Sequence, residues 1–150
     1  MASKYAKGLH AAFTTLEANQ SYLKNLEKLK AEGSVPKDQY EAMKEEYGRK
    51  IPPSESEIKA IKNRVERELE AVKKELGVIK KDLDNLSTRN KVGEVPLEKF
   101  RSMDSKMRHR MEQIETEMAE FDNLLKANCA ADIWQGGHPG KSSGYSAPRL

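Results

Sequence analysis

The side chains that most often act as nucleophiles or metal ligands are few in this 150-residue chain. The three histidines, His10, His109 and His138, lie far apart, without Cys, Asp or Glu partners at metal-ligand spacing. The single cysteine, Cys129, has only Lys126 as a basic neighbour within a helical turn, whereas a reactive thiolate needs an electropositive niche. We therefore expect a chain that is not an enzyme, with no catalytic residue, metal, cofactor or small-molecule substrate.

Positive charge is densest at Arg101, Lys106, Arg108 and Arg110. Clustered Lys and Arg can neutralise phosphate, so these residues are candidate contacts for nucleic acid or an anionic membrane. The alternative is a solvated helix surface, because the chain interleaves 27 Lys and Arg with 24 Asp and Glu, for a net charge of +3. No aromatic residue stands among the cations, which leaves base stacking without a platform.

The elements that carry these residues are predicted helices, and one helical segment occurs twice, sixty residues apart. The matching residues of the first copy are Leu23, Asn25, Leu26, Gly33, Val35, Pro36, Tyr40 and Met43. Those of the second copy are Leu83, Asn85, Leu86, Gly93, Val95, Pro96, Phe100 and Met103. Glycine closes a helix in the left-handed conformation, and proline suits the start of the next helix. Each copy therefore predicts a hairpin, and its Gly-x-Val-Pro turn resembles the hairpin turns of many coiled-coil proteins.

The apolar spacing predicts four helices, over residues 3–31, 37–50, 55–90 and 97–128, with steps of three and four that are typical of heptads. Pro52 and Pro53 predict the end of the second helix, and Ser54 with Glu57 predicts a capping box for the third. We expect an all-α fold of two duplicated hairpins in an elongated antiparallel coiled-coil or four-helix arrangement. The predicted domains are residues 1–53, 54–129 and a flexible Gly/Ser/Pro-rich tail, 130–150.

One apolar stripe is expected to lack a partner within its own hairpin. The helix over 3–31 is about twice as long as the helix over 37–50, so Leu9, Phe13 and Leu16 must pack on the second hairpin or on another chain. Phe13, Tyr22 and Leu29 also widen this stripe, which indicates more than one neighbour. We interpret Leu9, Phe13 and Leu16 as a seam that binds a partner.

The tail has two interpretations. Its Gly, Ser and Pro content is typical of disordered trailing sequence. Ile133, Trp134 and Tyr145 favour instead a short recognition segment, because large aromatic side chains dominate interface hot spots.

Together these patterns predict a structural or interaction protein that self-assembles or scaffolds partners through coiled-coil seams, such as a filament or capsid-like subunit. The expected partner is a second copy or another helical protein. The alternative is a protein that binds nucleic acid or an anionic membrane through residues 101–110. The first residues lack the apolar stretch of a signal peptide, and we expect a cytoplasmic protein.

Overall fold

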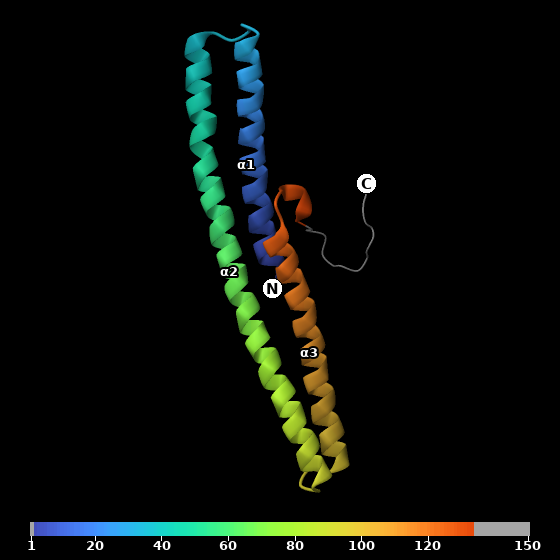
Figure 1. Ribbon diagram of the computed structural model, residues 1–150. Coiled ribbons are helices and arrows are strands. Elements are labelled where there is room, and N and C mark those ends of the chain that lie inside the picture. The colour runs from blue at the N-terminus through green and yellow to red at the C-terminus, as the bar shows by residue number, and fades with distance from the viewer. Residues whose placement is uncertain (1, 134–150) are drawn as a thin grey trace. The chain divides into compact units, whose positions relative to one another are not determined.

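A computed structural model describes residues 2–133 (Figure 1). Three α-helices make up nearly all of them: α1 (Ala2–Ala31), α2 (Lys37–Lys91) and α3 (Leu97–Lys126), with a short 3-10 turn, η1 (Ala130–Asp132), after α3. These residues contain no strand. The predicted all-α class is confirmed, and the four-helix arrangement is wrong because the described chain has three long helices.

Both Gly-x-Val-Pro turns adopt the predicted conformation. Gly33 and Gly93 have φ angles of 72° and 90°, the left-handed region that favours glycine. The Gly33 N–H donates to the Lys30 carbonyl at 3.0 Å, and the Gly93 N–H donates to the Asn90 carbonyl at 3.0 Å. The next N–H in each turn reaches back five residues, so α1 and α2 end in the same hydrogen-bonded motif.

The predicted helix end at Pro52 and Pro53 is wrong, because α2 runs through both prolines. Neither proline has an N–H to donate to the carbonyl four residues back, at Gly48 or Arg49. Both rings are exposed. The predicted capping box is also absent, since the Ser54 hydroxyl donates to the Lys50 carbonyl at 3.0 Å, inside the helix.

Packing explains why the helix continues. The apolar spacing carries on across the prolines, through Tyr47, Ile51, Ile58 and Ile61. Ile61 is buried, and its Cδ1 atom lies 3.3 Å from where a side chain at Gly8 would begin. A proline inside a helix costs about 3 kcal/mol, and burying one large aliphatic side chain returns about 1.5–3 kcal/mol. A few buried side chains therefore outweigh the two prolines.

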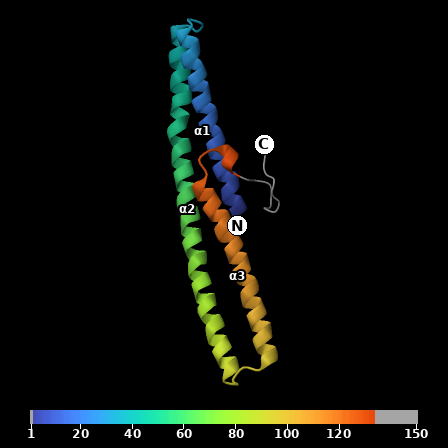
Figure 2. The same cartoon turned by 45° about the vertical axis from the view of Figure 1, so that its right-hand side comes forward.

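The chain divides into two compact units, and the division falls within α2. Unit 1 is Met1–Asn63 with Lys126–Leu150, and unit 2 is Arg64–Leu125. In unit 1, α1 lies alongside the first part of α2; in unit 2, α3 lies alongside the second part, as Figures 1 and 2 both show. The predicted domain limits at residues 53 and 129 stay a prediction, because these units are defined by packing alone.

Each unit has a narrow core that follows the heptad rows. The buried apolar residues of unit 1 are Ala2, Ala6, Leu9, Ala12, Phe13, Leu26, Tyr40, Ile61, Ala127 and Ile133. Those of unit 2 are Val65, Leu69, Val72, Leu86, Ile114, Phe121 and Leu124. The buried polar residues are Asn19 and Ser54, each bonded to a carbonyl of its own helix four residues back. The local partners spare both groups the cost of an unpaired buried dipole.

Replacing both prolines by alanine, Pro52→Ala with Pro53→Ala, should stabilise α2. The change restores two amide donors, and we expect the free energy of unfolding to rise by roughly 2–4 kcal/mol, less than the two helix penalties because proline also restricts the unfolded chain. Urea denaturation followed by circular dichroism measures the change, and Glu55→Ala on the same exposed surface is the matched control. A double variant no more stable than the wild type would contradict this account of α2.

Candidate interaction surfaces

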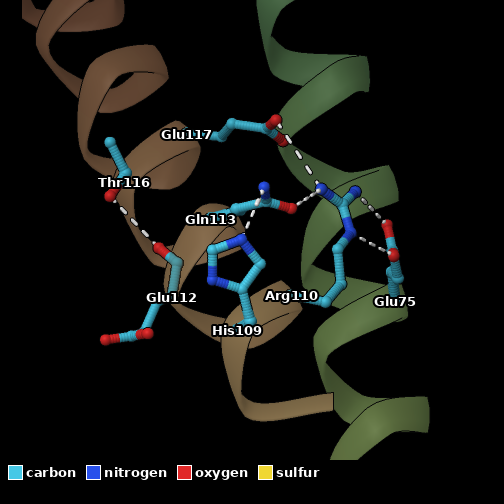
Figure 3. Close-up of polar contacts among 7 residues, drawn as sticks. All are labelled: Glu75, His109, Arg110, Glu112, Gln113, Thr116 and Glu117. Atoms are coloured by element: carbon cyan, nitrogen blue, oxygen red, sulfur yellow. Dashed lines mark hydrogen bonds and ion pairs between the residues drawn. The ribbon is translucent and has the colours of Figure 1, made fainter. Parts of the chain in front are cut away.

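The best-defined polar contact between two helices joins Arg110 of α3 to Glu75 of α2 (Figure 3). Arg110 Nε donates to Glu75 Oε2 at 2.7 Å, and Arg110 Nη2 donates to Oε1 at 2.8 Å. Two parallel bonds suit the planar guanidinium and give the contact directional specificity. The side chains remain 37% and 41% exposed, so solvent screens the pair and its main effect is to align the two helices.

Residues of α3 itself surround the same guanidinium. Figure 3 shows Gln113 and Glu117 beside Arg110, at 3.4 Å for the Gln113 Oε1 bond and 3.9 Å for the Glu117 ion pair. Gln113 also lies 3.4 Å from the His109 ring nitrogen. Arg110, predicted as an anion contact, therefore already binds two carboxylates of its own unit.

This pairing shifts both ionisation equilibria. The hydrogen bonds from Arg110 lower the pKa of Glu75 below its ordinary value of 4.5, and Glu75 in turn raises the pKa of Arg110. Because the pKa of Glu75 is lower in the folded chain, its ionised form stabilises the fold above the ordinary pKa. That contribution is lost as the pH falls through the lowered value.

The other three predicted anion contacts divide into two kinds. Arg108 Nε donates to both carboxylate oxygens of Asp104, one turn earlier on α3, at 3.1 and 3.0 Å. Arg101 and Lys106 are exposed. Two of the four cations are thus held in ion pairs, and binding of nucleic acid or a membrane by this group stays a prediction.

The predicted partner seam lies mostly inside the chain. Leu9 and Phe13 are buried, and Leu16 is partly buried. We expected this half of α1 to pack on residues 54–129 or on another chain, and Ile61 of that range lies beside Gly8 because α2 continues beyond the prolines. Partner binding at the seam stays a prediction, and it would require this packing to open.

Residues 127–133 return to unit 1 after α3 and are fastened there. Lys62 Nζ donates to the carbonyl oxygen of Ala127 at 2.5 Å, and the Ala130 N–H donates to Glu17 Oε2 at 2.7 Å. Ile133 is buried. Ile133, predicted as part of a recognition segment, is therefore an anchor of this return segment, and a role in recognition stays a prediction.

The return segment also holds itself in shape. Asp132 Oδ2 accepts from the Asn128 N–H at 2.8 Å. That bond, followed by one from the Cys129 side chain, lowers the pKa of Asp132. The other predicted recognition residues, Trp134 and Tyr145, lie outside the described residues.

An apolar surface that we call the tip strip was only half visible in the sequence. Tyr22 and Leu29, one heptad apart on α1, are 49% and 43% exposed, and Met43 on α2 is 37% exposed. The Tyr22 ring contacts the Tyr47 ring at 5.1 Å between centroids, which joins the two helix faces. The widened apolar stripe on α1 indicated this surface in the sequence. The residues that α2 contributes could not be predicted, because they depend on how α2 is aligned against α1.

Two further searches of the described residues gave negative results. Within residues 2–133 no group of three or more His, Cys, Asp or Glu side chains is placed to hold a metal ion. No helix in that part of the chain is both long and apolar enough to cross a membrane.

Replacing Glu75 by glutamine should lower stability at neutral pH and leave it nearly unchanged in acid. The amide cannot accept two charge-assisted bonds from Arg110, and the wild type loses the same advantage once Glu75 is protonated. Thermal unfolding as a function of pH measures the difference, with Glu66→Gln on the same helix as the control for net charge. A stability difference that persists below the pKa of Glu75 would contradict the assignment.

Replacing Lys62 by methionine should loosen the return segment. Methionine keeps the helix propensity and most of the aliphatic stem but removes a charged donor, and we expect a loss of about 1–3 kcal/mol. Urea denaturation measures the loss, hydrogen exchange at Ala130 locates it, and the exposed Lys59→Met is the control. Unchanged exchange at Ala130 would show that the bond to Ala127 does not hold the segment.

Comparison with known proteins places this architecture in a family. Residues 11–127 match the family described as the CdvA-like coiled-coil domain. The match includes both Gly-x-Val-Pro turns and the whole of α2 and α3. Curated proteins and solved structures give no significant match. This coiled-coil family is of a structural, non-enzymatic type, and the matched region is more than half of the sequence, so the chain belongs to the CdvA-like coiled-coil domain family.

Proposed function

We propose that this protein is a non-catalytic structural component that self-associates, or scaffolds another helical protein, through its coiled-coil surfaces. The observation that carries the proposal is the tip strip. It leaves three large apolar side chains of unit 1, Tyr22, Leu29 and Met43, between 37% and 49% exposed, and the Tyr22 ring contacts the Tyr47 ring of α2. Large apolar side chains left exposed in one region of a protein are a common mark of interaction sites.

The geometry of the tip strip favours a helix as the partner. Tyr22 and Leu29 are one heptad apart, which is the spacing that presents side chains to a neighbouring helix. Two packed helices bury one stripe on each, and a second stripe stays in water until another helix covers it. Covering it returns about 25 cal/mol per Å² of apolar area. The coiled-coil character of the family supports the proposal that the partner is a helix.

The form of the assembly follows from symmetry. A contact that uses the same patch on both copies gives a closed pair, whereas a head-to-tail contact between different patches gives a ring or a filament. Our proposal therefore includes filament-like and capsid-like subunits. It also places the protein in the cytoplasm, where one unpaired cysteine is an ordinary composition.

The alternative, binding of nucleic acid or an anionic membrane at residues 101–110, receives less support. Arg108 is bound to Asp104, and Arg110 is bound to Glu75. Arg101 and Lys106 are exposed, and Arg108 is 65% exposed but shares its charge with Asp104. Two cations give a weaker electrostatic footprint than a dedicated polyanion-binding surface does.

Light scattering on the purified chain tests self-association. We expect a mass well above the 17.0 kDa of one chain, and we expect Leu29→Glu to shift it toward that value, because a carboxylate on the strip would be buried without a partner. Ala11→Glu, at an exposed site of α1 outside the tip strip, is the control.

A chain truncated after Ile133 tests the tail without removing the return segment. A wild-type mass of 17.0 kDa at all concentrations would refute self-association.

A further inference from the structure

The charges of unit 2 are separated into two halves. The half next to the turn, residues 78–110, carries nine Lys and Arg and five Asp and Glu, and we call it the basic half. The other half, residues 64–77 with 111–125, carries four Lys and Arg and nine Asp and Glu, and we call it the acidic half. Unit 2 is therefore nearly neutral as a whole and strongly polarised along its length.

The separation is sharpest along α3. Residues 99–110 carry five basic side chains and the single acid Asp104, whereas residues 111–125 carry five acids and no Lys or Arg. Glu112 and Glu115 in the acidic run are exposed, as are Arg101 and Lys106 in the basic run. Mostly positive charge thus faces solvent over about three turns of helix, and negative charge over the next four or so.

Contacts within unit 2 do little to neutralise this pattern. The α2 segment 64–77, which runs antiparallel to the acidic end of α3, holds four basic and four acidic side chains and adds no net compensation. The ion pair of Arg110 with Glu75 and Glu117 joins the two halves at their boundary. The ion pairs of Arg108 with Asp104 and of Arg89 with Glu94 lie inside the basic half.

We infer that unit 2 pairs side by side and antiparallel with unit 2 of a second copy, basic half against acidic half. A two-fold axis makes each favourable contact occur twice, and a parallel arrangement would oppose like charges along the whole length. The inference rests on the proposed self-association and names a surface for it that is separate from the tip strip. Both halves are satisfied at once by the same partner, which a polyanion bound only to the basic half does not achieve.

The pairing is sensitive to salt. Exposed charges interact over a Debye length of about 8 Å at physiological ionic strength and about 3 Å at 1 M. Association through unit 2 therefore weakens as salt rises, whereas association through an apolar strip does not. Sedimentation velocity at low and high salt separates the two contributions in the full chain.

The decisive experiment reverses two exposed charges in each half in turn, in the full-length chain. One variant carries Arg101→Glu with Lys106→Glu, and the other carries Glu112→Lys with Glu115→Lys. The first variant leaves the basic half with seven basic and seven acidic side chains, and the second leaves the acidic half with six basic and seven acidic side chains. Each variant alone therefore loses most of the charge complementarity, and we expect its low-salt pairing to weaken roughly tenfold or more. An equimolar mixture of the two should recover pairing relative to either variant alone, because the unchanged acidic half of the first meets the unchanged basic half of the second and the reversed side chains meet side chains of opposite sign.

The controls separate charge location from total charge and from folding. Lys24→Glu with Lys28→Glu changes the net charge as the first variant does, but on exposed residues of α1 in unit 1, and it should leave low-salt pairing unchanged. Circular dichroism checks the helicity of each variant. Restoration on mixing is itself proof that both variants are folded.

Each other outcome refutes the inference in a distinct way. If the wild type self-associates and both reversed variants do so equally well, the charge halves are irrelevant while the proposed function stands. If each variant loses pairing and the mixture does not recover it, antiparallel complementarity is wrong. A wild type that is monomeric even at low salt refutes both proposals. If the first variant loses binding of a short DNA duplex without any change in self-association, the basic half serves a polyanion instead.

Discussion

Burial of a single apolar stripe along α2 is the constraint on which the rest of the structure depends. The chain has few aromatic residues and a high fraction of charge, so a thick core is not available to it. Its apolar side chains lie instead in rows that pair helix with helix. That pairing is strong enough to carry α2 through Pro52 and Pro53, although two amide donors are missing there. The prolines are tolerated because their rings are exposed and the row beside them stays in register.

Local features of the sequence predicted the local features of the fold. Gly33 and Gly93 sit where only a positive φ closes the helix, and the helix ends there were found correctly. The break at Pro52 was wrong for a physical reason. The destabilisation by a proline can be read from the local sequence. The burial that offsets it involves Ile61, which packs near Gly8, fifty-three residues away in the chain. A local rule cannot weigh a contact that exists only after the helices have met.

For the candidate site residues, too, contacts between neighbours in the sequence could be predicted and contacts between helices could not. Arg101, Lys106, Arg108 and Arg110 look alike in the sequence, yet Arg110 is held by Glu75 on another helix. Asp104 holds Arg108 at a spacing of four residues, which a helical sequence pattern can indicate, whereas Glu75 lies thirty-five residues away. Leu9 and Phe13 were expected to need a partner because the length of α2 was underestimated. The contribution of α2 to the tip strip could not be predicted either, because it depends on the contact between Tyr47 and Tyr22.

Because of the return segment, the residues of unit 1 are not all synthesised before those of unit 2. Unit 2 is one continuous stretch, whereas unit 1 is built from two stretches separated by all of unit 2. A ribosome making this protein releases every residue of unit 2 before it releases Ala127 and Ile133. Unit 2 can therefore form its hairpin before the return segment docks, while unit 1 remains open at the surface that residues 127–133 later cover. The first hairpin to begin is thus the last to be finished, and for that interval the surface beside Glu17 and Lys62 lacks the cover that the return segment later gives it.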